Sequence, residues 1–216
     1  MESHRSLNKN FTQSRKEITP LPQCKSATFD LRPSTFDLRP SLILERNNMK
    51  VSVAPYNTDW PRIYEAEANK LREVPGKQFV DIHHIGSTAV PGMPAKPVID
   101  IMMLVWNIET VDACNEKFVR LGYEAMGEYG ISGRRFFRKG DKTRTHHVHV
   151  FEANSSEAER HLAFRDYLIA HPDEALEYGQ LKQRLAQRFP NDIEAYIDGK
   201  NDFIKELEQK ALKWYK

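Results

Sequence analysis

The chain has 216 residues and a formal net charge of +2, with 40% hydrophobic and 29% charged residues. This apolar fraction suffices for a packed core, and the near-neutral charge argues against a protein that binds nucleic acid by bulk electrostatics. No secretory signal or membrane-length apolar run is visible and two cysteines exclude a disulfide framework, so we expect a cytoplasmic protein without membrane contact.

Residues 1–48 differ in composition from the rest of the chain. They carry eight Lys/Arg and five Asp/Glu, a net charge of +3, and are rich in Ser, Thr, Asn and Pro without a sustained helical or strand period. They also contain a tandem copy of the string TFDLRPS, at 28–34 and 35–41. We expect a disordered basic tail, whose duplicated motif could dock a protein partner, followed by a folded domain over 49–216.

Hydrophobic periodicity begins near Met49 and predicts alternating strands and helices up to residue 121. The expected elements are a short strand over 50–55, a helix from Thr58 that Pro75-Gly76 ends, strands over 79–85 and 98–106 separated by a Gly/Ser/Thr/Pro-rich turn, and a helix over 110–121.

The second half changes from extended chain to helix. Segments 134–138 and 145–152 flank a Lys-Gly-Asp-Lys turn and predict a hairpin. Three helices are then expected between residues 156 and 214, the first opened by a capping box with Ser156 as N-cap. The whole pattern predicts an α+β fold: a small mixed sheet with flanking helices and a C-terminal run of three helices.

The turn after the strand 79–85 concentrates residues suited to phosphate. Gly86 lets the backbone approach a ligand, and the hydroxyl and N–H groups of Ser87 and Thr88 can cradle a phosphate if they open a short helix. Lys96 can add a cation. Asp100 lies within an apolar strand, where a carboxylate is costly unless it is paired or holds a metal. An ion pair that only holds the sheet together is the alternative.

The hairpin strand over 145–152 places His147 and His149 on one face. Two imidazoles so placed can bind a transition metal, act as general acid and base, or hold phosphate when protonated. A simply solvated strand face is the alternative. Because Asp100 is expected nearby, we interpret all three as catalytic candidates, with Asp100 and His149 as metal ligands.

Two arginines are further candidates for contacts with phosphate. Arg138 alternates with Arg134 to one face of the hairpin and could neutralise a polyphosphate, although a solvated hairpin explains it equally well. Arg165 has no acidic residue three or four positions away, so a local ion pair is not expected and its side chain could reach a bound anion. Lys182, one helix later, is a weaker candidate of the same kind.

Several stretches of the chain resemble the GrpB-like family. They are HIGSTAVPG at 84–92, AKPVIDI at 95–101, VAPYNTDWP at 53–61, HVHVFE at 147–152 and RHLAFRDYL at 160–168. The resemblance extends from Met49 to the C-terminus. It implies a nucleotidyltransferase-like fold, in which Gly-Ser follows the first core strand and carboxylates on the next strands bind divalent metal. Gly86-Ser87 and Asp100 match this pattern, but Met102 stands where active transferases of that fold carry a second carboxylate.

The resemblance thus implies a protein that binds a nucleotide or other phosphorylated small molecule with Mg²⁺ or Mn²⁺ and that can transfer a nucleotidyl group. Because a thioether is a poor ligand for Mg²⁺, a non-catalytic binding or regulatory module is the alternative. Such domains also occur fused to dephospho-coenzyme A kinase. This chain lacks the string Gly-x-x-x-x-Gly-Lys-[Ser/Thr], so P-loop kinase activity is not expected.

Overall fold

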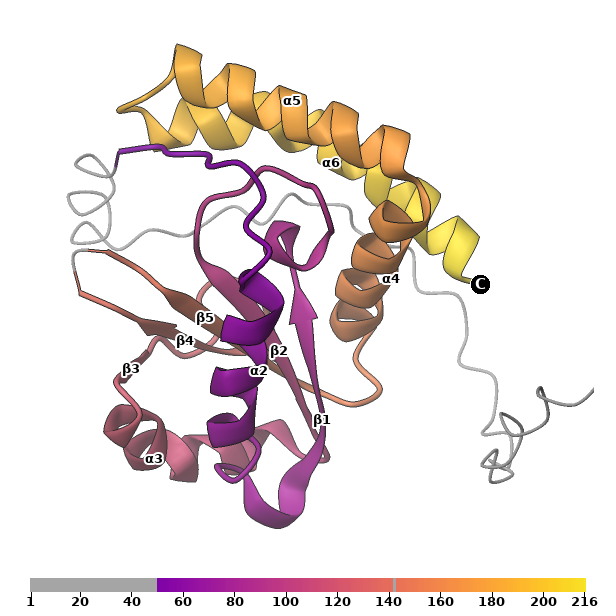
Figure 1. Ribbon diagram of the computed structural model, residues 1–216. Coiled ribbons are helices and arrows are strands. Elements are labelled where there is room, and N and C mark those ends of the chain that lie inside the picture. The colour runs from indigo at the N-terminus through magenta and orange to yellow at the C-terminus, as the bar shows by residue number, and fades with distance from the viewer. Residues whose placement is uncertain (1–49, 142) are drawn as a thin grey trace, which may run out of the picture. The chain divides into compact units, whose positions relative to one another are not determined.

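The computed structural model describes residues 50–141 and 143–216, so the predicted tail, its repeat and the boundary at residue 49 lie outside the described residues. The helices in Figure 1 are α2 (Trp60–Leu71), α3 (Asn115–Arg120), α4 (Ser156–Ala170), α5 (Pro172–Arg188) and α6 (Ile193–Tyr215), with three 3-10 helices, η1 (Gly76–Gln78), η2 (Ser87–Ala89) and η3 (Ile108–Cys114). None of the described helices combines the length and the apolarity that a membrane span needs.

Five strands form one mixed sheet in the order β1-β2-β5-β4-β3. They are β1 (Phe79–Ile85), β2 (Ile99–Val105), β3 (Tyr123–Ala125), β4 (Arg135–Lys139) and β5 (His146–Glu152). β2 pairs in parallel with β5, and the other neighbours pair antiparallel. The α+β class, the central apolar strand, the hairpin and the three C-terminal helices are confirmed.

The two faces of the sheet are covered by different helices. One face packs Ile101 and Met103 of β2 with Val148 and Val150 of β5 against α2 and α3. The other face carries the alternate residues of β2 and β5, and its apolar part packs against Ala158 of α4. Because strand residues alternate between faces, Asp100, His147 and His149 all lie on this second face.

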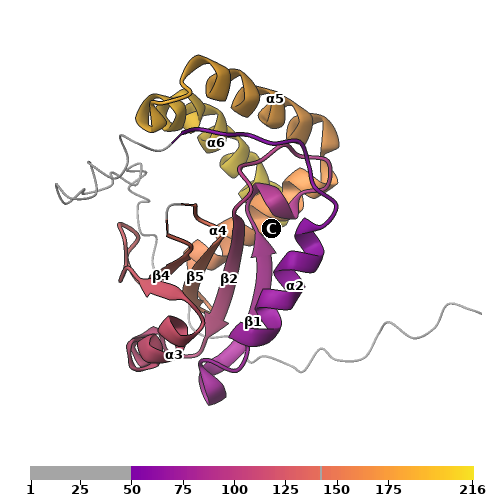
Figure 2. The same ribbon diagram turned by 60° about the vertical axis from the view of Figure 1, so that its left-hand side comes forward.

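The C-terminal helices position the turn that follows β1. Figure 2 shows α5 and α6 side by side at one end of the sheet. Val90 and Met93 of the turn are buried in a cluster with apolar side chains of α4, α5 and α6. α5 approaches so closely that a Cβ at Gly179 would lie 2.8 Å from Pro94 Cδ. The turn is therefore held between the sheet and these helices.

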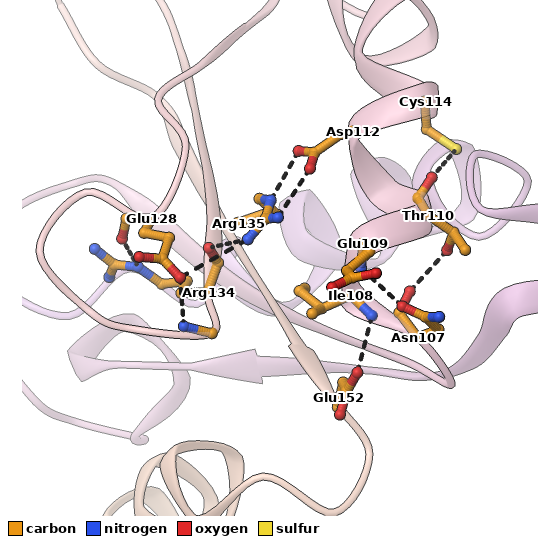
Figure 3. Close-up of polar contacts among 11 residues, drawn as sticks. Asn107, Ile108, Glu109, Thr110, Asp112, Cys114, Glu128, Arg134, Arg135 and Glu152 are labelled. Carbon is orange, nitrogen blue, oxygen red and sulfur yellow. Dashed lines mark hydrogen bonds and ion pairs between the residues drawn. The ribbon is translucent and has the colours of Figure 1, made fainter.

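Polar contacts brace the remaining elements. Arg135 of β4 donates two hydrogen bonds, of 2.7 and 2.8 Å, to the Asp112 carboxylate of η3, and Ile108 N donates to Glu152 Oε1 at 3.2 Å (Figure 3). On the α2 side, the buried carboxylate of Glu67 accepts hydrogen bonds from Lys139 and Tyr123. These contacts fix η3 and α2 against the strands.

Four local predictions differ from the structure. Residues 50–55 form no strand, because their pairing is limited to a single bridge between Ala54 and Ala95. The helix expected over 110–121 is 3-10 up to Cys114 and α-helical only from Asn115. The short strand β3 was not predicted, since glycines punctuate the surrounding sequence. Ser155 rather than Ser156 is the N-cap of α4: its backbone is extended, and its side chain accepts from Glu157 N.

Candidate functional site

Asp100, His147 and His149 converge on one face of the sheet. The parallel register places Asp100 beside His147, and His149 is two residues further along β5. His147 Nδ1 lies 3.1 Å from Asp100 Oδ1, and His149 Nε2 lies 3.5 Å from the same oxygen. One potential ligand atom from each residue falls within 4.8 Å of the others. The structure therefore brings together the three residues that the sequence singled out.

The electrostatics of this cluster favour an ionised carboxylate at Asp100. Burial alone would raise the pKa of Asp100, but hydrogen bonding and charge from His147 and His149 outweigh it and hold the pKa well below its usual range. Burial lowers the pKa of His149, although Asp100 opposes that shift. Apart from its 3.5 Å contact with Asp100 Oδ1, the buried Nε2 atom of His149 has no polar partner among the described residues.

Arg134 contacts His149 from the other side of the ring. Its Nη1 lies 3.3 Å from His149 Nδ1, and its other nitrogens donate to the main-chain oxygens of Glu128 and Tyr129, as Figure 3 shows in part. Arg134 is only 5% exposed, and burial lowers its pKa to about 10. The structure thus assigns Arg134 to positioning His149, which corrects the interpretation of a hairpin arginine that faces a polyphosphate.

The turn after β1 lies directly against Asp100. Gly86 has φ +70° and ψ −171°, and a Cβ there would lie 2.8 Å from Asp100 Oδ2. Ser87 begins the 3-10 helix η2, in line with the expected short helix. Thr88, by contrast, is 1% exposed, and its Oγ1 is hydrogen-bonded to His84 Nε2 at 2.9 Å. The Thr88 side chain is therefore buried, and its hydroxyl holds the turn against β1 instead of facing a ligand.

One lysine from the C-terminal helices contacts Ser87, and a second lies near that lysine and Asp100. Lys182 of α5 is 3% exposed, and its Nζ donates to Ser87 Oγ at 2.7 Å. Burial, reinforced by the charge of Lys200, lowers the pKa of Lys182 to about 7. Burial also lowers the pKa of Lys200 on α6, and the carboxylate of Asp100 opposes that shift. Lys182 and Lys200 thus add positive charge beside the turn and Asp100.

The other predicted phosphate ligands divide into two groups. Lys96 is exposed and close enough to Asp100 for the carboxylate to act on its pKa: desolvation lowers this pKa, and Asp100 opposes the shift. Arg138 lies on the same face as His147, yet its Nε donates to Glu124 Oε2 at 2.6 Å. Its guanidinium is therefore engaged by β3, which the sequence did not predict.

Arg165 has a structural place that the sequence did not indicate. Its Nε donates to the adjacent Asp166 at 2.7 Å, and its Nη1 donates to the main-chain oxygen of His84 at 3.0 Å. The expectation was based on neighbours three or four residues away, so it missed the ion pair with Asp166, which is adjacent in the sequence. Tyr64 similarly donates to the main-chain oxygen of Ile82. Together they satisfy acceptors on β1, an edge strand, and leave Arg165 committed to the fold.

Met102 fills the position where a second strand carboxylate was expected. It is fully buried, in a cluster with Ile85, Leu104, Phe151 and Ala158. His149 lies beside it in the parallel register. The second side chain available to a metal therefore comes from the neighbouring strand as an imidazole and not from β2 as a carboxylate.

Lys200 and the role of Arg134 were not found from the sequence, and Lys182 was given little weight. Both lysines occupy positions on the apolar stripes of their helices, Lys182 between Tyr178 and Leu185, and Lys200 between Tyr196 and Leu207. A lysine at an otherwise apolar inward position is unusual, because burying an ammonium group is costly. The position of each lysine on the apolar side of its helix was therefore the signal in the sequence that could have identified it.

Comparisons with known proteins agree with this architecture. A family model described as GrpB protein matches residues 50–210. UPF0157 protein YqkA of Bacillus subtilis is 47% identical over 77% of this chain. The matched region covers about half (49%) of the length of YqkA. Glutamate-rich protein GrpB of Alkalihalophilus pseudofirmus is 35% identical over 74% of this chain and 95% of its own length.

Among solved structures, the crystal structure of conserved protein GrpB from Enterococcus faecalis matches with a TM-score of 0.73 and 47% identity, covering 76% of this chain and 99% of that chain. A dephospho-CoA kinase of Mycolicibacterium paratuberculosis also matches, at 26% identity over 46% of its length, in line with the expected occurrence of the domain in such kinases. Because the family model covers residues 50–210 and these relatives align with most of the described residues, the chain belongs to the GrpB family.

Proposed function

We propose that the chain binds a phosphorylated small molecule, such as a nucleotide, with a phosphate group against the turn at Gly86–Ala89. The observation that supports this most directly is Lys182, a buried lysine whose Nζ donates to Ser87 Oγ at 2.7 Å. A buried ammonium group is unfavourable unless it is paired. None of the carboxylates in the described ranges lies within ion-pair distance of Lys182.

The charge balance around the turn favours an anion with more than one negative charge. Lys200 and Lys96 are influenced by Asp100, and Lys200 in turn influences Lys182. Two lysines therefore lie near one carboxylate, and the third, Lys182, lies near Lys200. A phosphate monoester carries roughly −1.5 to −2 charge at neutral pH, which would compensate this excess.

Nucleotidyl transfer is the reaction that the family resemblance suggested, and a metal ion bound beside the phosphate would stabilise its transition state. The burial of Met102 favours the alternative, a module that binds without turnover, because two-metal transfer needs a further carboxylate. Consumption of a nucleoside triphosphate, measured with and without Mn²⁺, separates the two. Transfer predicts metal-dependent turnover that is lost in Asp100→Asn, and binding alone predicts none.

The binding proposal itself is tested by thermal unfolding against pairs of phosphorylated and unphosphorylated compounds, beginning with ATP and adenosine. A ligand at about 100 times its Kd stabilises by about 2.7 kcal/mol, which raises Tm by roughly 5–10 °C for a chain of this size. We expect a shift with the phosphorylated member only, lost in Lys182→Met and kept in the exposed control Lys205→Met. An equal shift in Lys182→Met, or no shift with any phosphorylated compound, would overturn the proposal.

A further inference from the structure

We propose that Asp100, His147 and His149 form a mononuclear site for a transition metal, of the class of Mn²⁺, Fe²⁺ or Zn²⁺, instead of the carboxylate-based Mg²⁺ site that the family resemblance implied. The proposal does not depend on phosphate binding, because the metal alone is the probe. Its basis is the geometry of three side chains on two adjacent central strands.

The separations between the ligand atoms match those around a bound ion. Metal–ligand bonds of about 2.0–2.2 Å in tetrahedral or octahedral geometry place neighbouring ligand atoms roughly 2.8–3.6 Å apart. Asp100 Oδ1 lies 3.1 Å from His147 Nδ1 and 3.5 Å from His149 Nε2. One potential ligand atom from each of the three residues lies within 4.8 Å of the others. An ion could therefore bind with small movements of the side chains.

The chemistry of the donors selects the class of metal. Mg²⁺ prefers oxygen ligands, whereas imidazole suits Zn²⁺, Fe²⁺ and related ions. Two of the three donors here are imidazoles, and the position that could have supplied a second carboxylate is the buried thioether of Met102. Two histidines and one carboxylate are a known donor set for transition metals that leaves coordination positions open for a ligand.

An incompletely paired atom points to the same conclusion. His149 Nε2 is buried, and its polar contact among the described residues is the 3.5 Å approach to Asp100 Oδ1, which does not have the geometry of a hydrogen bond. Buried polar atoms nearly always have a hydrogen-bond partner. A metal ion bound between the two atoms would satisfy both. The two strands that carry the donors lie side by side in the middle of the sheet, which keeps the donors in place.

Arg134 sets the expected strength of binding. A histidine that binds metal usually donates its other N–H to an acceptor, which orients the ring and strengthens the bond. Here the atom opposite His149 Nδ1 is Arg134 Nη1, at 3.3 Å, and an arginine can only donate. While Nδ1 accepts from Arg134, a neutral His149 ring carries its proton on Nε2, so a metal that binds Nε2 must displace that proton and break the contact with Arg134. This requirement weakens metal binding. We therefore expect an ion that chelators remove readily and that exchanges, and not one held permanently.

Titration of the untagged, chelator-treated full chain with Co²⁺, Zn²⁺, Mn²⁺ and Mg²⁺ tests the proposal, with calorimetry for affinity and visible absorption of Co²⁺ for its ligands. We expect one Co²⁺ or Zn²⁺ per chain, Co²⁺ bands that show nitrogen ligation, and at least about 100-fold weaker binding of Mg²⁺. His149→Gln, whose amide oxygen can still accept from Arg134, should lose at least about 100-fold in affinity, since even partners of ligands contribute 10–100-fold.

His146→Gln is the matched control. His146 precedes His147 on β5, faces the opposite side of the sheet, and also has a buried Nε2 without a partner among the described residues. Its replacement should leave metal affinity unchanged. If His149→Gln fails to fold, Asp100→Asn gives the same test with a nearly isosteric side chain. Mg²⁺ binding as tight as Zn²⁺ binding, no stoichiometric binding, or an equal loss in His146→Gln would overturn the proposal.

Discussion

Gly86 and Asp100 lie in such close contact that the turn and the carboxylate form one unit. A Cβ at Gly86 would lie 2.8 Å from Asp100 Oδ2, a separation at which one of the two must move. Gly86 also has φ +70° and ψ −171°, a conformation that is essentially restricted to glycine. Two independent constraints thus require glycine at the point where β1 meets the turn.

Replacement of Gly86 by alanine should therefore cost more than the backbone strain alone. We expect Gly86→Ala to destabilise the fold by about 3 kcal/mol, as the sum of an unfavourable φ and a clash with Asp100. Gly92→Ala is the control, because Gly92 has φ +76° but a Cβ there would meet no atom within 4 Å, and it should cost about 1 kcal/mol. Urea unfolding measures both; equal losses would show that the contact with Asp100 has no energetic weight.

Lys182 is predicted to reduce stability in the absence of ligand. Its pKa falls from 10.5 to about 7 in the folded chain, mainly through burial. The unfolded chain then binds more protons between pH 7 and 10.5, so stability should rise with pH in that window. Lys182→Met keeps the length of the side chain without the charge. We expect it to be more stable at pH 7 by roughly 1–3 kcal/mol and to lack this rise.

Denaturant unfolding at pH 7 and pH 10 measures both effects of Lys182→Met. The exposed Lys205→Met should follow the wild-type chain at each pH. A Lys182→Met chain less stable than wild type at pH 7 would mean that the hydrogen bond to Ser87 outweighs the cost of burial.

Glu67 should make stability sensitive to acid. Burial alone would raise its pKa, but hydrogen bonds from Lys139 and Lys70 outweigh this and lower the pKa from 4.5 to about 2. The ionised Glu67 therefore makes its full contribution to the free energy of unfolding above pH 4.5, and this contribution is lost as the pH falls from 4.5 through 2. Glu67→Gln, which leaves Lys139 unpaired, should cost about 3 kcal/mol at pH 7. The difference from wild type should shrink below pH 4.5; a difference independent of pH would contradict this account.

Restoring a second carboxylate on β2 should damage the fold. Met102 is fully buried against Ile85 and Phe151, so Met102→Asp would place a charge in an apolar cluster. We expect a loss of at least about 3 kcal/mol in urea unfolding. Met102→Leu, which conserves volume, should lose less than about 1.5 kcal/mol. A Met102→Asp chain as stable as Met102→Leu would show that this position tolerates an ionised group.

The sequence predicted most of the fold because the periodicities were strong and local. β1 matches the expected strand over 79–85, and the apolar run over 98–106 is the buried centre of the sheet. The failures occurred where tertiary contacts decide the outcome. Residues 50–55 alternate like a strand, but they pair with the rest of the chain only through the bridge between Ala54 and Ala95. β3, in contrast, is a strand because it pairs with β4.

The part of the site that lies on the strands could be predicted, because alternation along a strand shows which of its residues share a face. Asp100, His147 and His149 were identified from their spacing, and the parallel register of β2 and β5 brings them together. The lysines were harder to find because they come from helices that are distant in sequence. Lys182 lies 95 residues from Ser87, and only the packing of α5 against the turn joins them. The prediction for Arg165 was wrong for the opposite reason: its ion-pair partner, Asp166, is the next residue in the sequence.

The most direct test of phosphate binding at Lys182 is a calorimetric titration with ATP at pH 8 in two buffers that differ in ionisation enthalpy. The terminal phosphate is deprotonated at this pH, and Lys182 is mostly neutral because its pKa is about 7. Binding should therefore draw a proton onto Lys182, so that the observed enthalpy differs between the buffers for the wild-type chain. Enthalpies that agree in both buffers, or no heat of binding at all, would contradict the account.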